Sequence, residues 1–119
     1  MAIYDQLPVY KAVYDLLLQL FEITKKMDRD FKFTIGEKIK TEAIELIVRI
    51  YRANSVSDKV LLLSGAKENV EVLRLLFRLM NDLKQVSLKE FVALSEKTES
   101  ISKQINAWYL QQSKIISKV

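Results

Sequence analysis

Hydrophobic residues recur every three or four positions along most of the chain, which is the spacing of one face of an α-helix. Short polar or irregular breaks fall near residues 28–33, 54–57 and 86–87. The pattern therefore predicts helices over about 8–27, 35–53, 58–85 and 88–116. Short connections favour antiparallel neighbours, so we expect one all-α domain over residues 1–119, an up-down-up-down four-helix bundle.

Residues that favour the first turn of a helix stand at each predicted start. Pro suits the first turn because its missing N–H has no partner there. Ser or Thr followed three residues later by Glu has the spacing of a capping box. The residues expected to begin helices are Pro8, Thr34 with Glu37, Ser57 or Asp58, and Ser87 with Glu90.

The first three predicted helices carry hydrophobic residues around more of their circumference than a small bundle can bury. At about 100° per residue their apolar arcs span roughly 200°, whereas an isolated bundle needs only about 100°. The fourth carries one narrow stripe. Long helices that cross could bury two sides, but a monomer with the surplus exposed would carry a large apolar patch. We therefore expect a homo-oligomer.

The amino-acid composition excludes several fold classes and several kinds of catalytic and metal site. Half of the 119 residues are hydrophobic, with two Gly, one Pro, no Cys and no His. Few turn-forming residues argue against a β-sandwich or barrel. The missing Cys and His remove disulfides, thiolate catalysis, His-based triads and the usual zinc or haem ligands. No catalytic residue, cofactor or metal site is expected.

The chain is mildly basic and shows no export or membrane signal. Nineteen Lys and Arg against fifteen Asp and Glu give a net charge of +4, which permits an anionic partner without requiring one. No basic leader begins the sequence, and its apolar runs are only a few residues long. We expect a cytoplasmic protein.

Charged residues indicate solvated helix faces more than reactive sites. Carboxylates such as Glu45 and Glu71 stand three or four residues from an Arg, the spacing of surface ion pairs. A small helical enzyme such as a pericyclic mutase would need charges facing the core, and the core stripes contain none. Aromatic residues do not alternate with basic ones on any exposed face, so stacking platforms for single strands are not indicated.

Three segments resemble a known family: RDFKFTIGEKIKTEAIELIVRIYRAN at 29–54, EVLRLLFRLMNDLKQVS at 71–87 and LSEKTESISKQINAW at 94–108. They are similar to four-helix bundle proteins encoded in intervening sequences of large-subunit ribosomal RNA genes. Within that group they look closest to the accessory variability determinant (Avd) proteins of diversity-generating retroelements. The Asn-Ile-Ala-Glu-Gly segment of the intervening-sequence branch is missing, which favours the Avd-like branch.

The resemblance implies a homopentameric ring with a basic surface that binds DNA or RNA without strong sequence preference and associates with a reverse transcriptase. Arg suits phosphate geometry, so the candidate nucleic-acid-binding residues are Arg49, Arg52, Arg74 and Arg78, followed by Lys38 and Lys84. The leading hypothesis is a non-enzymatic oligomeric bundle that binds nucleic acid through phosphate contacts, a reverse transcriptase, or both. The alternative is an oligomeric scaffold with protein partners only.

Overall fold

The computed structural model describes residues 7–117, with side chains through Ile115. Four long helices and one single-turn helix account for almost all of this range, and no strand occurs within it. The elements are α1 (Pro8–Lys25), α2 (Arg29–Lys32), α3 (Ile35–Ser55), α4 (Val60–Asp82) and α5 (Leu88–Ser117). The all-α prediction is confirmed, and the interval predicted as irregular contains the one-turn helix α2.

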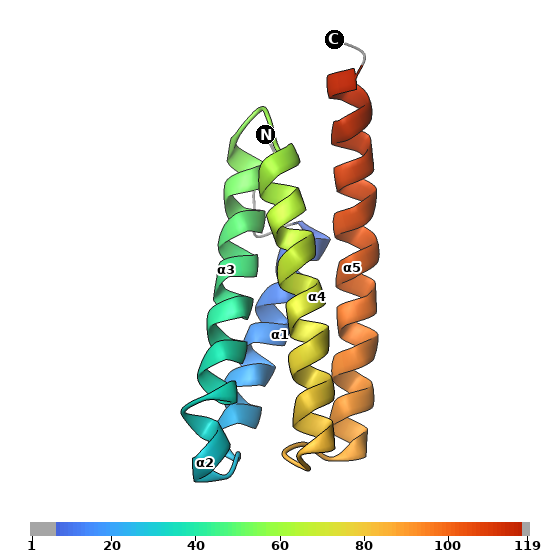
Figure 1. Ribbon diagram of the computed structural model, residues 1–119. Helices are drawn as coiled ribbons and strands as arrows, with labels where there is room; N and C mark the ends of the chain where they lie inside the picture. The colour runs from blue at the N-terminus through green and yellow to red at the C-terminus, as the bar shows by residue number, and fades with distance from the viewer. Residues whose placement is uncertain (1–6, 118–119) are drawn as a thin grey trace.

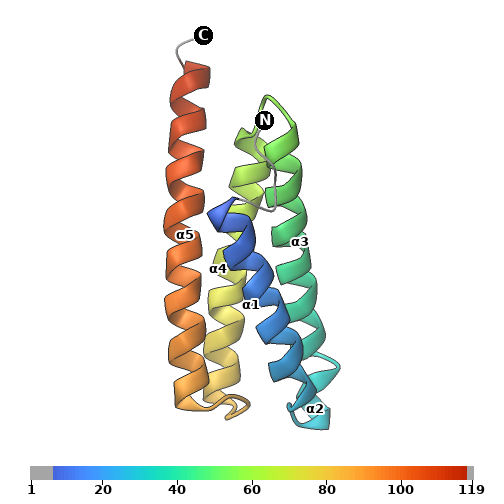
Figure 2. The ribbon, with the colours of Figure 1, turned by 180° about the vertical axis from the view of Figure 1, so that it is seen from behind.

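The four long helices run alternately along one axis, each antiparallel to the next (Figure 1). Around the bundle α1 packs against α3, α3 against α4, α4 against α5, and α5 against α1. The result is a rod 51 Å long and 22 Å across. Both views show α4 and α5 close together at their turn and further apart toward the opposite end (Figures 1 and 2). Within the described part of the chain, none of the helices combines the length and hydrophobicity needed to cross a bilayer.

The core consists of apolar side chains that repeat at three- or four-residue intervals on each long helix. Removing a Leu, Ile or Phe side chain from water stabilises the fold by about 1.5–3 kcal/mol. The largest fully buried side chains are Leu16, Leu20, Ile39, Leu46, Ile50, Leu63, Leu73, Phe77, Met80, Leu94, Ile101 and Ile105. Because every long helix contributes to this set, the core runs along the length of the rod.

The two capping boxes expected from the sequence have different outcomes. At α5 the prediction is confirmed: the Glu90 backbone N–H donates to Ser87 Oγ at 3.0 Å, and the Ser87 N–H donates to Glu90 Oε1 at 2.9 Å. At α3 it is wrong, because Thr34 makes no side-chain cap bond there. Its hydroxyl instead donates to backbone carbonyls of α2, and Glu37 pairs with Lys40 at 2.8 Å.

Helix α4 ends at Asp82, three residues before the predicted end. The Gln85 N–H donates to Met80 O at 2.8 Å and the Lys84 N–H donates to Asn81 O at 3.1 Å. These two bonds form a Schellman motif, in which the chain turns through a left-handed residue. Lys84 is that residue, with φ of 60°, and no other non-glycine residue in the described range has a positive φ. Gly is usual at this position, so the sequence pattern did not indicate the earlier stop.

Candidate functional site

Two of the six candidate residues belong to a polar network in the seam between α3 and α4. Arg49 Nη1 donates to Asn69 Oδ1, and Asn69 Nδ2 donates to Glu42 Oε2 at 2.7 Å. Lys38 pairs with Glu42 at 2.9 Å, and Arg49 lies 3.8 Å from Glu45. Asn69 and Glu42 are both buried. Lys38 and Arg49 therefore already have intramolecular partners, and the contacts of Arg49 and Glu42 with Asn69 join α3 to α4.

Hydrogen bonding decides the ionisation of Glu42. Burial on its own would raise the pKa of this carboxyl. The hydrogen bonds from Asn69 and Lys38 outweigh that effect and hold the pKa of Glu42 below its ordinary value of 4.5. The same contact raises the pKa of Lys38 above 10.5. Both groups are therefore charged at neutral pH, and the network carries a complete ion pair.

The other four candidate residues lie in three separate places. Arg52 is exposed near the end of α3, and Lys84 is exposed at the turn between α4 and α5. Arg74 and Arg78, one helical turn apart on α4, line the same hollow. The structure therefore brings Arg74 and Arg78 together, and it distributes the remaining candidates over different faces.

That hollow is the lower part of a groove between α4 and α5 and measures about 320 Å³. Arg74 closes its upper end by donating to Glu71 at 2.9 Å and to Glu99 on α5 at 2.8 Å. Arg78 has no carboxylate partner within the described residues. The side chains around the hollow are Arg74, Phe77, Arg78, Phe91, Ser95, Thr98 and Glu99.

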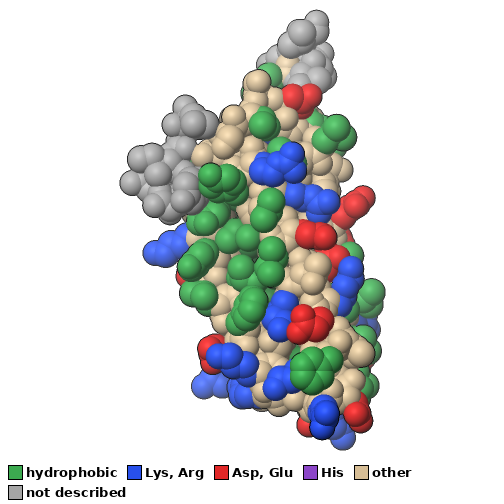
Figure 3. All heavy atoms as spheres, turned by 90° about the vertical axis from the view of Figure 1, so that its left-hand side faces the viewer, with side chains coloured by type: hydrophobic (Ala, Val, Ile, Leu, Met, Phe, Trp, Pro, Cys, Tyr) green, Lys and Arg blue, Asp and Glu red, His purple; other side chains and the backbone are tan. Residues whose placement is uncertain are grey.

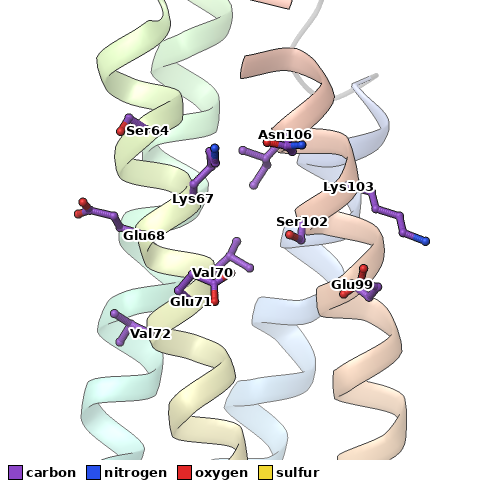
Figure 4. A pocket seen from close by; sticks show the side chains of 11 residues that line it. Ser64, Lys67, Glu68, Val70, Glu71, Val72, Glu99, Ser102, Lys103 and Asn106 are labelled. Carbon is purple, nitrogen blue, oxygen red and sulfur yellow. The ribbon is translucent and has the colours of Figure 1, made fainter. Parts of the chain in front are cut away.

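The upper part of the groove is a larger hollow of about 640 Å³, where α4 and α5 separate. Buried Val70 and Ile105, with partly buried Val72, are the apolar part of its lining. Lys67 from α4 and Asn106 from α5 point into it from opposite walls, and Ser102 lies below Asn106 (Figure 4). The full lining is Ser64, Lys67, Glu68, Val70, Glu71, Val72, Glu99, Ser102, Lys103, Ile105 and Asn106.

Two lysines lie against aromatic rings of α5. One is in α4 and the other is the N-cap of that helix. Lys67 Nζ is 4.2 Å from the centre of the Tyr109 ring, and Lys59 Nζ is 6.0 Å from that of Trp108. The sequence reading found no pairing of basic and aromatic residues because it compared positions along a single helix. These partners are more than 40 residues apart in the chain, and only the packing of α4 on α5 brings them together.

A different surface lies over α1 and α3, where hydrophobic side chains gather into one patch (Figure 3). We call it the α1–α3 apolar face, and its six large side chains are between 39% and 54% exposed. Its residues are Tyr14, Leu18, Phe21, Ile44, Val48 and Tyr51. Crossing of the helices therefore does not bury the whole of the wide apolar arcs, and part of their hydrophobic surface is exposed on the single chain.

The described residues contain no cluster of three or more carboxylates placed to hold a metal ion. The groove is lined by hydroxyl, amide, carboxylate, ammonium and guanidinium groups. The fold and these surfaces define a small all-α, four-helix bundle protein whose chemistry lies on its faces.

Comparison with known proteins agrees with that class. The sequence profile of the bAvd-like family matches residues 7–112, which is most of the chain. The chain belongs to this family, whose name refers to the accessory protein of diversity-generating retroelements. A search of curated proteins returns no match.

Proposed function

We propose that this chain is a non-enzymatic, Avd-like accessory protein that forms a closed homo-oligomer and binds nucleic acid. The α1–α3 apolar face is the surface for self-association, with five copies as the ring size that the family resemblance suggests. The groove between α4 and α5 contacts the phosphates, and a reverse transcriptase is the expected protein partner.

The observation that carries the proposal is the division of the surface into two kinds of face. Six half-exposed large apolar side chains gather on α1 and α3. The groove on the α4–α5 side carries polar groups and the unpaired Arg78. A ring built through one face repeats the other around its circumference, which multiplies a modest basic surface into one that a polyanion can contact at several points.

Phosphate contacts predict binding that weakens steeply with salt, because each contact releases condensed counterions. The test is a fluorescence anisotropy titration of labelled DNA and RNA at several salt concentrations. We expect a linear fall of log affinity with log salt and little dependence on base sequence. Arg78→Gln should reduce the slope, whereas Lys11→Gln, an exposed change on α1, should leave it unchanged.

The α1–α3 apolar face on its own would also suit a scaffold with protein partners only. That alternative predicts an assembly of defined mass that binds neither DNA nor RNA at low salt. Absence of binding to both polymers would therefore reject the nucleic-acid part of the proposal while leaving self-association to be judged by mass.

A further inference from the structure

The upper hollow between α4 and α5 has the size and chemistry of a site for one unit of a polymer. A volume of about 640 Å³ exceeds that of a nucleobase, and the opening lies between two helices. Ser64, Ser102 and Asn106 supply hydroxyl and amide groups, which both donate and accept hydrogen bonds as the edge of a base requires. Val70 and Ile105 supply an apolar surface for a flat ring.

The charges around this hollow suit a phosphate at its rim. Glu71 and Glu99 share Arg74 as their partner at the lower end, at 2.9 Å and 2.8 Å, so that end keeps one net negative charge. Lys67 and Lys103 line the upper part and have no carboxylate partner within the described residues. Figure 4 shows Lys67 directed into the hollow and Lys103 directed outward from α5, while Glu68 points away. One cation, Lys67 of α4, therefore points into the opening, and a second, Lys103, lies on the outer side of α5.

Two aromatic rings of α5 follow the residues that line the hollow, and one of them, Tyr109, contacts the lining residue Lys67. Tyr109 and Trp108 are half-buried on α5, and the ammonium groups of Lys67 and Lys59 lie over them. Lys67 is therefore held by the Tyr109 ring at the edge of the hollow, where its ammonium group can meet a phosphate.

From this arrangement we propose that the upper α4–α5 hollow binds an unpaired nucleobase, so that the protein prefers single-stranded or locally unpaired nucleic acid. The inference rests on the proposed function and adds the class of nucleic acid and the place where it binds. A base inside a duplex cannot enter a hollow between two helices, whereas an unpaired base can turn into it and leave its phosphate near Lys67.

The test compares three labelled polymers of equal length by fluorescence anisotropy: a single strand, the same strand annealed to its complement, and a fully abasic strand with the same phosphates. We expect the single strand to bind about tenfold more tightly than either of the others. Ser102→Phe fills the hollow and should remove that difference. Ser100→Phe places the same ring at an exposed position outside the hollow and should preserve it.

A second variant separates an effect on base binding from an effect on folding. Asn106 is exposed, so Asn106→Ala removes the amide without disturbing the core, and circular dichroism should be unchanged. We expect it to reduce the preference for the single strand over the abasic strand. Equal binding of the three polymers, or an unchanged preference in Ser102→Phe and Asn106→Ala, would overturn the inference and leave the proposed function standing. No binding to any polymer at low salt would overturn both.

Discussion

The absent side chain of Gly65 makes room for the side chain of Arg49. A Cβ at Gly65 would lie 2.7 Å from Arg49 Nε, closer than real Cβ atoms come, and 3.1 Å from Arg49 Cδ, so the Arg49 side chain would have to move. Arg49 in turn is the donor to Asn69 Oδ1, inside the buried part of the α3–α4 seam. Gly65 thus permits a specific polar contact between two helices at a position where Gly lowers helix stability.

Changing Gly65 to Ala should therefore change the free energy of unfolding by different amounts in two backgrounds. Ala raises helix stability by about 1 kcal/mol, but here its methyl group displaces the guanidinium and leaves Asn69 without its donor. We expect Gly65→Ala to give no gain in the natural sequence and a gain of about 1 kcal/mol when Arg49 is already Ala. Urea unfolding of the four combinations measures this coupling, and equal effects in both backgrounds would refute it.

Glu42 links the same network to pH. Its folded pKa lies below the ordinary value of 4.5, so its ionised form stabilises the fold at neutral pH. This contribution is lost as the pH falls below the ordinary value of 4.5 and through the folded pKa. Urea titrations should show Glu42→Gln less stable than the natural protein at pH 7 and equally stable near the acid limit. Glu96→Gln, at an exposed position, should match the natural protein throughout, and a constant difference for Glu42→Gln would count against the mechanism.

For single residues, the spacing along the sequence predicted the surface ion pairs but did not predict which polar groups are buried. The i,i+4 spacing of Glu45 and Arg49 predicted an ion pair, and the two groups lie 3.8 Å apart. Nothing in that spacing indicates that Asn69, twenty residues further on, receives the stronger contact. Long-range polar contacts depend on the rotation of each helix about its own axis, which the pattern of one chain segment does not contain.

At the scale of whole helices, local sequence motifs predicted some helix ends correctly and others wrongly. Ser87 and Glu90 close a capping box as expected, since both partners lie within four residues. Thr34 does not, because the chain before it forms the extra turn α2 and offers its hydroxyl other carbonyls. The end of α4 at Asp82 was not predicted either, because the left-handed position that follows it is occupied by Lys84 where the motif usually has Gly.

Lys84 offers a test of that stop. A Cβ in the left-handed region costs about 1 kcal/mol, a cost that Gly avoids. Lys84→Gly should therefore raise the midpoint of thermal unfolding, while Lys84→Ala removes the same charge without relieving the backbone and should not. Equal midpoints for the two variants would show that the ammonium group, and not the backbone conformation, determines the outcome.

For the whole molecule, the amount of hydrophobic surface proved more informative than any motif. The number and order of the helices followed from periodicity, because each long helix repeats the pattern over many turns. The width of the apolar arcs predicted an exposed surplus, and six half-exposed side chains on α1 and α3 carry much of it. The α4–α5 groove could not be predicted, because it depends on how far two helices separate and on contacts between residues more than 40 positions apart.

Association through the α1–α3 apolar face would determine the mass of the protein in solution. If copies associate through this face, light scattering should give a multiple of the 13.9 kDa chain mass. Leu18→Glu combined with Val48→Glu places two carboxylates in the centre of the face, where burial without a partner is costly, and should return the protein to 13.9 kDa with unchanged helicity. Leu88→Glu, at a more exposed position outside the face, is the matched control and should keep the assembly intact. A natural protein that runs as a monomer, or a double variant that keeps the full mass, would show that copies do not associate through the apolar face.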